Sequence, residues 1–211
     1  MSAVGILLLQ QEEDVNKVNV MQPSEFLKIV HFSEKLKDTT RHCTTSKGRR
    51  ESVAEHSWRI SLMALFLRTE FPELDIDKVI AMCLIHDLGE AFTGDIPSFN
   101  KTQKDEVVED GLFRKWIEDL PEGLSSSILS LYEEMIALES KESKLYKALD
   151  KIEAVIQHNE SPIETWSQNE YQLNKTYGVD EVSFSEWMVK LRAEVLEETI
   201  KKIDDSKKLS E

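Results

Sequence analysis

The apolar residues of this chain recur at helical spacing over nearly its whole length, and this pattern restricts the fold more than any other feature. Ile60, Met63 and Leu67, for example, follow one another at steps of three and four, which places them on one face of a helix. No segment shows the convincing alternation of a strand, and we find no internal repeat or domain linker. We therefore predict an all-α, single-domain helical fold.

The expected elements follow from caps and breakers. Ser24 is a candidate N-cap of the first helix, Ser52 and Glu55 have the spacing of a capping box, and Asp75 or Asp77 begins a helix that ends near Gly94. Residues 38–51 and 94–103 are expected to be loops, and further helices are expected at about 104–119, 124–140, 142–159, 163–176 and 184–205. We divide the chain into a peripheral N-terminal extension (1–21), a helical domain (22–203) and a charged tail (204–211).

Charge and composition exclude several classes of function. The chain has 26 Lys and Arg against 40 Asp and Glu, a formal charge of -14, which argues against a nucleic-acid polymer as partner. A small anionic substrate needs only a local basic spot. The apolar run VGILLL is too short for a signal peptide or a membrane span. The two cysteines form no disulfide framework, so we expect a cytoplasmic protein without a membrane partner.

Several ionisable residues are expected on buried helix faces. His56 precedes Ile60 by four residues, and His86 follows Val79 by seven, so both histidines should point inward. Asp87 adjoins His86, and Asp150 borders another apolar face. Buried without partners, such groups would each cost several kcal/mol, on the order of 2–7 for a polar group. A divalent cation bound by imidazole nitrogen and carboxylate oxygen would remove this conflict.

Each of these residues also has an ordinary structural explanation. A single histidine on an apolar face is usually a hydrogen-bonded core residue, a His-Asp pair is a common dipeptide, and Asp150 alone could be a solvated helix residue. Spacing does not prove that three helices converge. The remaining histidines, His31, His42 and His158, suggest no second metal cluster, and His158 is expected to be a helix-end residue.

Three motifs in order resemble those of a known family. SVAEHSW, LIHDLGEAFTGDIP and ALDKIEA resemble the HD-domain metal-dependent phosphohydrolases, and within them the bacterial 5′-deoxynucleotidases, over about residues 22 to 200. The resemblance implies four ligands of one divalent ion: His56, His86, Asp87 and Asp150. It implies that Glu90 positions or activates the attacking water, that Asp95 contacts the sugar 3′-hydroxyl, and that Arg41 holds the substrate phosphate.

One position departs from the family pattern. In the deoxynucleotidases that this chain resembles, a tryptophan follows the arginine and helps to exclude the ribose 2′-hydroxyl. Here the residue is His42, which is smaller and offers a hydrogen-bonding edge, so strict selection of deoxyribose is not expected. The basic residues Lys47, Arg49 and Arg50 follow; they either attract a phosphate or form a solvated loop.

The resemblance thus implies a metal-dependent phosphomonoesterase that hydrolyses (deoxy)ribonucleoside 5′-monophosphates to nucleoside and phosphate. Mixed nitrogen and oxygen ligands suit Mn, Co, Fe, Ni or Zn, and a homodimer is expected from the same resemblance. Two alternatives remain open. One is an HD hydrolase acting on a triphosphate, a cyclic nucleotide or an alarmone. The other is a non-catalytic module that binds a metal or nucleotide, against which the complete set of ligand residues argues.

Overall fold

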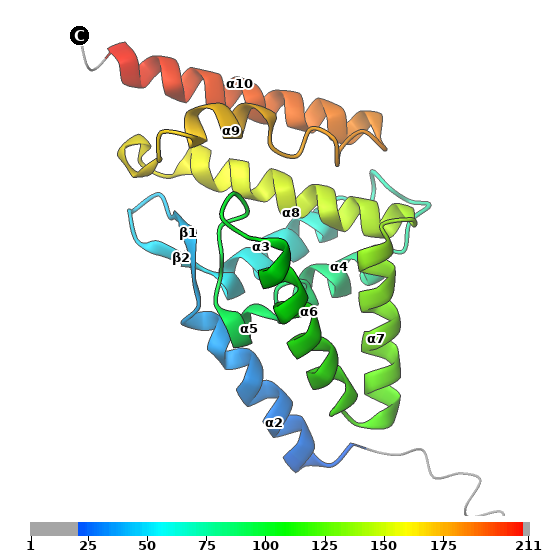
Figure 1. Ribbon diagram of the computed structural model, residues 1–211. Coiled ribbons are helices and arrows are strands. Elements are labelled where there is room, and N and C mark those ends of the chain that lie inside the picture. The colour runs from blue at the N-terminus through cyan, green and yellow to red at the C-terminus, as the bar shows by residue number, and fades with distance from the viewer. Residues whose placement is uncertain (1–20, 209–211) are drawn as a thin grey trace, which may run out of the picture.

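The computed structural model describes residues 21–208, and the prediction of an all-α fold is confirmed (Figure 1). Two short strands form the sheet of the described residues. The elements in chain order are α2 (Pro23–Ser33), the 3₁₀ helix η1 (Glu34–Lys37), β1 (Thr40–Thr44), β2 (Arg50–Ser52), α3 (Val53–Phe66), α4 (Ile76–Ile85), α5 (Glu90–Thr93), α6 (Gln103–Glu118), α7 (Glu122–Ala137), α8 (Lys141–Glu160), the 3₁₀ helix η2 (Ile163–Thr165), α9 (Glu170–Thr176) and α10 (Glu186–Lys208).

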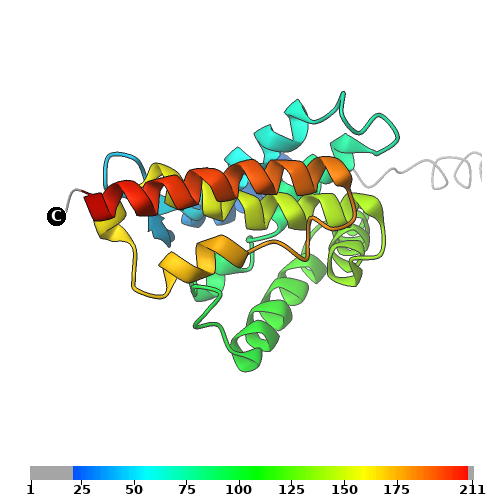
Figure 2. The ribbon, with the colours of Figure 1, turned by 90° about the horizontal axis from the view of Figure 1, so that it is seen from above.

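The core lies where α3, α4 and α8 pack together. Ile60, Val79 and Leu149 are fully buried there, at positions that the helical spacing of the sequence had assigned to inner faces. Helix α10 lies along α8 on the side away from α3 and α4, with α9 beside the pair (Figure 2). Over residues 21–208, the helices are too short or too polar for any of them to cross a membrane.

The helix starts agree with the sequence analysis at two of three positions. Ser52 and Glu55 form the predicted capping box of α3, and the Asp75 carboxylate caps α4 through the Lys78 N–H. The cap of α2 is Gln22, paired with Glu25, so the prediction of Ser24 was wrong. Pro23 occupies the first helical position, where a missing N–H costs no hydrogen bond, and this moves the start forward by two residues.

The segment 38–51, expected to be a loop, forms an antiparallel hairpin. Thr40 pairs with Ser52 and Thr44 with Arg50, and Gly48 takes a positive φ of 80° in the turn. The Gln157 side chain of α8 donates a hydrogen bond to the Thr44 carbonyl. The strands were missed because they are short and polar and are stabilised by packing on α8, which local sequence does not reveal.

Two expected helices are interrupted. The helix predicted to reach Gly94 ends at Ile85, and a turn separates it from α5, which begins at Glu90. Helix 163–176 is divided into η2 and α9, between which the indole N–H of Trp166 donates to the His158 carbonyl. Helix α10 continues to Lys208, so residues 204–208 form its last turns. The predicted extension lies outside the described residues, apart from residue 21.

Candidate metal centre and pocket

The four predicted metal ligands meet at the junction of α3, α4 and α8. His56 lies on α3, His86 and Asp87 follow the last turn of α4, and Asp150 lies on α8. The Nε2 atom of His56 is 3.4 Å from Asp150 Oδ1 and 3.9 Å from Asp87 Oδ2. His86 Nε2 is 2.9 Å from Asp87 Oδ2 and 3.9 Å from Asp150 Oδ1. Residues far apart in sequence thus present two nitrogens and two oxygens to one point.

Hydrogen bonds on the far side of each ring orient the two histidines. His56 Nδ1 lies 2.5 Å from Glu153 Oε2, and His86 Nδ1 lies 2.8 Å from the Cys83 carbonyl oxygen. Both acceptors need a proton on Nδ1, which leaves Nε2 as the atom that faces the carboxylates. Both Nε2 atoms are buried and have no hydrogen-bond partner among the described residues. A divalent cation fits this arrangement, because it satisfies both lone pairs and both carboxylates at once.

A proton competes with that cation at His56. Burial and the charge of Arg41 lower the pKa of His56, but Glu153 and Asp150 outweigh them and raise it to about 9. Burial raises the pKa of Asp150, but the ammonium groups of Lys147 and Lys151 outweigh burial and hold this pKa well below its ordinary value. Asp150 therefore stays ionised, while a cation must displace the proton of His56, which makes its binding pH-dependent.

Arg41 lies beside the same centre. It is on β1, with Nη1 3.9 Å from Asp87 Oδ2 and Nε 3.4 Å from Glu51 Oε2 on the paired strand. Burial and the Glu153 carboxylate raise the pKa of Glu51 to about 7, against the lowering effect of Arg41. The hairpin that the sequence analysis missed is therefore the element that brings Arg41 to the candidate metal ligands.

Glu90 is buried at the start of α5, and its Oε2 has no hydrogen-bond partner among the described residues. Burial, followed by the charges of Asp87 and Asp95, raises the pKa of Glu90 to about 10. A divalent cation beside Asp87 would act in the opposite direction by stabilising the ionised form. Glu90 is thus a carboxyl group with an unused oxygen and a strong affinity for a proton.

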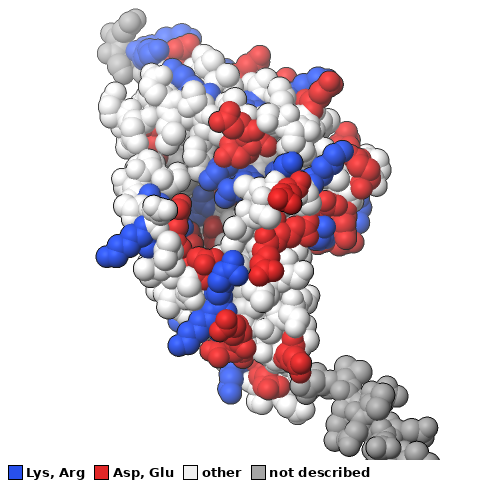
Figure 3. All heavy atoms as spheres, turned by 45° about the vertical axis from the view of Figure 1, so that its right-hand side comes forward, with Lys and Arg blue, Asp and Glu red and all other residues white. Residues whose placement is uncertain are grey.

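A pocket of about 240 Å³ connects these groups. Arg41, Asp87, Glu90 and Asp150 line it, and so do His42 and Asp95. Burial raises the pKa of Asp95, and Arg41 opposes this effect. Figure 3 shows a hollow whose rim carries both acidic and basic side chains. Every site residue named from the sequence is therefore either in the candidate metal centre or in the wall of this pocket.

Sequence reasoning missed several residues around the pocket. Lys147 Nζ is 2.9 Å from Asp150 Oδ2, and Lys151 Nζ lies 3.6 Å from the same atom and 2.9 Å from the Tyr177 hydroxyl. Glu153, one turn after Asp150, is fully buried. The motif ALDKIEA contained a signal for it, since a glutamate three residues from a candidate ligand shares its helix face.

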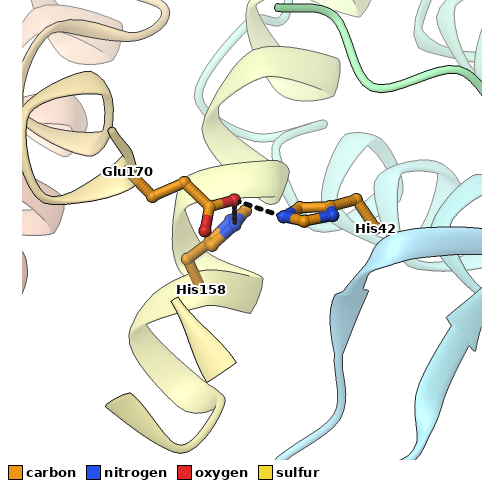
Figure 4. Close-up of side chains that lie close together, drawn as sticks. All are labelled: His42, His158 and Glu170. Atoms are coloured by element: carbon orange, nitrogen blue, oxygen red, sulfur yellow. Dashed lines mark hydrogen bonds and ion pairs between the residues drawn. The ribbon is translucent and has the colours of Figure 1, made fainter. Parts of the chain in front are cut away.

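His158 lies in the last turn of α8, as predicted, and it also lines the pocket. Its Nε2 and that of His42 each lie 2.8 Å from Glu170 Oε1 (Figure 4). The sequence suggested no second metal cluster, but the structure brings His42 and His158 together with Glu170 in a geometry that could hold an ion. The protonation of this trio decides whether it can do so. The sequence gave no indication that Glu170 belongs to the pocket. Glu170 begins α9, and the sequence analysis had joined α9 to η2 as one helix.

The basic loop does not extend the pocket. Arg49 pairs with the Glu55 carboxylate, and Arg50 Nη1 lies 2.6 Å from the His42 carbonyl oxygen and 3.3 Å from that of Arg41. Neither side chain lines the pocket that contains Asp87 and Asp150. Arg50 instead stabilises the backbone of β1, and with it the placement of Arg41.

Curated relatives match part of the chain. The 5′-deoxynucleotidase HDDC2 of Mus musculus is 33% identical over 112 residues, which cover 52% of this chain and 55% of the relative. The 5′-deoxynucleotidase HDDC2 of Dictyostelium discoideum is 30% identical over 146 residues, covering 64% and 76%. The chain thus spans about half the length of the mouse relative that it matches.

Solved structures and a family model match more of the chain. A predicted metal-dependent phosphohydrolase from Magnetospirillum magnetotacticum superposes with a TM-score of 0.72 at 25% identity, covering 85% of this chain and 93% of that one. A conserved hypothetical protein from Pyrococcus furiosus gives 0.61 at 26% identity, covering 83% and 99%. The model of the family described as HD domain matches residues 33–192, more than half of the 211 residues. The chain belongs to the HD-domain family.

Proposed function

We propose that this protein is a metal-dependent phosphomonoesterase that hydrolyses (deoxy)ribonucleoside 5′-monophosphates to nucleoside and phosphate. One observation carries the proposal: two buried imidazole Nε2 atoms, which have no hydrogen-bond partner in the described part of the chain, face two carboxylates at the wall of a pocket that also contains Arg41 and Glu90. The names of the curated relatives, which are 5′-deoxynucleotidases, support the substrate class.

His56, His86, Asp87 and Asp150 would hold a single divalent ion, and Mn, Co, Fe, Ni and Zn all suit this ligand set. When bound, such an ion acts as a Lewis acid on a phosphoryl oxygen and lowers the pKa of a water ligand. Two neutral imidazoles and two carboxylates balance its charge, so an approaching phosphate meets a nearly neutral centre. Glu153 and the Cys83 carbonyl keep the two rings in the required orientation.

The remaining residues would act on the substrate. Arg41, held between Asp87 and Glu51, presents its guanidinium to the phosphate and neutralises charge on the transferring group. Glu90 positions the attacking water and accepts its proton through the unused carboxylate oxygen. Asp95 accepts a hydrogen bond from a sugar hydroxyl, and His42 lies next to Arg41 in the pocket wall.

We propose further that the protein is a cytoplasmic homodimer that binds no nucleic-acid polymer. Both cysteines are free and buried, which fits a reducing compartment. Helix α2 buries none of its residues and exposes Phe26, Leu27 and Val30, an apolar face that a second copy could cover. Sedimentation at micromolar concentrations measures the assembly, and a purely monomeric species would contradict this part.

Phosphate release from a panel of 5′-mononucleotides tests the central proposal. Purified protein supplied in turn with each candidate metal should release phosphate from dAMP, AMP or their pyrimidine counterparts, and Asp150→Asn should lose both metal and activity. Phenyl phosphate serves as a sugar-free ester in the same assay. Absence of phosphate release from every nucleotide, in protein whose metal content is one per chain, would rule out the nucleotidase activity.

A further inference from the structure

One end of the pocket holds a trio of ionisable side chains that the proposed reaction does not use directly. His42 comes from β1, His158 from α8 and Glu170 from α9, and their side chains point toward one another (Figure 4). Both Nε2 atoms are 2.8 Å from Glu170 Oε1. Glu170 is 1% exposed, and its other oxygen accepts the Ser167 backbone N–H at 2.5 Å. Three elements are therefore joined through one buried carboxylate.

The partners of His158 determine its protonation. Its Nδ1 lies 2.7 Å from the Ala154 carbonyl oxygen, and its Nε2 faces Glu170. A carbonyl and a carboxylate only accept hydrogen bonds, so both nitrogens carry protons. The pKa values agree: burial lowers that of His158, but contacts with Cys43 and Glu170 raise it to about 10. The pKa of Glu170 falls to about 2, because His158 and Ser167 outweigh its burial.

The same reasoning that favours a cation at the first centre argues against one here. At the first centre the Nε2 atoms of His56 and His86 have no hydrogen-bond partner within residues 21–208, whereas both nitrogens of His158 and both oxygens of Glu170 are hydrogen-bonded. The imidazolium of His158 balances the charge of Glu170. A metal would have to displace protons from both His42 and His158, so the trio is complete as a hydrogen-bonded unit.

The trio fixes the tautomer of His42. Because Glu170 only accepts, His42 Nε2 carries a proton, and in the singly protonated ring the lone pair is on Nδ1. Within residues 21–208 that Nδ1 makes no hydrogen bond, and the ring lines the pocket with 29% of its side chain exposed. The edge-on ring of Phe99, 5.5 Å away, contacts it from the loop after Asp95. The pocket wall next to Arg41 therefore offers a hydrogen-bond acceptor in a fixed place.

We propose that Glu170 and His158 are positioning residues that hold His42 as the Nε2–H tautomer, so that its Nδ1 accepts a hydrogen bond from the ribose 2′-hydroxyl of the substrate. This inference rests on the proposed nucleotidase function. Arg41 and His42 line the same pocket, so a nucleotide whose phosphate contacts Arg41 has its sugar within reach of His42. A ribonucleotide then makes one hydrogen bond to His42 that a deoxyribonucleotide, which lacks the 2′-hydroxyl, does not make.

Nitrogen NMR of the unaltered protein tests the tautomer directly. The chain has five histidines, so the imidazole signals can be assigned by replacing each in turn. We expect the singly protonated ring of His42 to carry its proton on Nε2, and His158 to be doubly protonated at pH 7.5. A His42 ring that carries its proton on Nδ1, or that exchanges between tautomers, would overturn the inference whatever the enzyme hydrolyses.

Glu170→Gln tests the consequence for the substrate. Glutamine has one oxygen, which the Ser167 N–H takes, so its amide nitrogen donates to His42 Nε2 and moves the ring proton to Nδ1. The ratio of kcat/KM for AMP to that for dAMP should fall about fivefold or more, as expected for one lost hydrogen bond. Asn169→Ala is the matched control, because it removes the acceptor of the Ser167 hydroxyl in the same turn and leaves Glu170 and both histidines unchanged.

The remaining outcomes separate the two proposals. An unchanged AMP to dAMP ratio in Glu170→Gln, with the variant folded by circular dichroism, would refute the positioning role. A second zinc or manganese equivalent per chain that disappears in Glu170→Gln would show that the trio is a metal site instead. Phenyl phosphate hydrolysis without any nucleotide hydrolysis would refute the proposed substrate class, while the NMR measurement still decides the tautomer.

Discussion

At the scale of single residues, the candidate metal centre includes a supporting carboxylate that would not itself touch the ion. Glu153 is fully buried and holds His56 through Nδ1. Glu153→Gln should weaken divalent-metal affinity by about 10- to 100-fold, because the histidine loses its fixed orientation and part of its basicity. Competition with a fluorescent chelator measures this. The control is Glu160→Gln, because Glu160 lies on α8 like Glu153 but is exposed and pairs with Arg59. Equal metal affinities of Glu153→Gln and the unaltered protein would contradict the role of Glu153.

Glu90 should separate metal binding from turnover. Glu90→Gln preserves the shape of the side chain but removes its ability to take a proton. We expect one metal per chain, as in the unaltered protein, and a kcat reduced by about 10²- to 10⁴-fold. Metal analysis and single-turnover kinetics on the same preparation check this. Turnover close to that of the unaltered protein would place the proton acceptor elsewhere in the pocket.

At the scale of elements, two glycines show how closely α8 is packed. Gly48 and Gly178 both have φ near +80°, but a Cβ on Gly178 would lie 2.9 Å from Lys151 Cβ, whereas Gly48 has open space. Gly48→Ala should lower the free energy of unfolding by about 1–2 kcal/mol through strain alone. Gly178→Ala should lower the free energy of unfolding by more than Gly48→Ala does, since the segment after α9 must also move away from α8. Urea denaturation of both compares them; equal losses would contradict the close approach.

The His158–Glu170 pair joins α8 to α9 and should make stability depend on pH. The raised pKa of His158, from 6.5 to about 10, contributes stability that is complete below pH 6.5 and disappears as pH rises through 10. The lowered pKa of Glu170, from 4.5 to about 2, contributes stability that is complete above pH 4.5 and is lost as pH falls through 2. The two statements describe one interaction, which is therefore strongest between about pH 4.5 and 6.5.

His158→Gln tests this dependence. The substitution leaves the Glu170 carboxylate buried without a charged partner, so we expect the free energy of unfolding to fall by about 3 kcal/mol near pH 6. The difference from the unaltered protein should shrink as pH rises from 6.5 toward 10. Denaturation curves at several pH values measure it, and a pH-independent difference would indicate that only packing was lost.

At the scale of the whole molecule, the candidate ligands join three core helices. His56, Asp87 and Asp150 bring α3, the end of α4 and α8 to one point, so an ion bound there stabilises the folded state selectively. Saturating metal at 100 times its dissociation constant should add about 2.7 kcal/mol to the free energy of unfolding. Thermal melts with added metal and with chelator measure the shift. Asp150→Asn should reduce it, and identical melts in both conditions would contradict the site.

Much of this architecture could be predicted from local pattern. The buried face of α3 and the position of His56 on it follow from helical spacing, and the cap at Ser52 follows from its partner Glu55. The hairpin did not follow, because Thr40–Thr44 has no apolar alternation and forms only against α8. The break after Ile85, which places Asp87 in a turn, also depends on tertiary packing: a Cβ at Gly89 would lie 2.9 Å from Glu109 Cγ of α6.

The sequence by itself determined the helical core and the identity of the candidate ligands, because periodicity and ordered motifs are properties of the chain. Only the tertiary structure decided what surrounds them. Glu153 and Glu170 are ordinary helix residues in the sequence, and their roles appear only when burial removes water and brings each carboxylate against histidine nitrogens. His42 is the clearest case. The sequence shows that a histidine follows Arg41, but the fold determines which nitrogen of that histidine carries the proton.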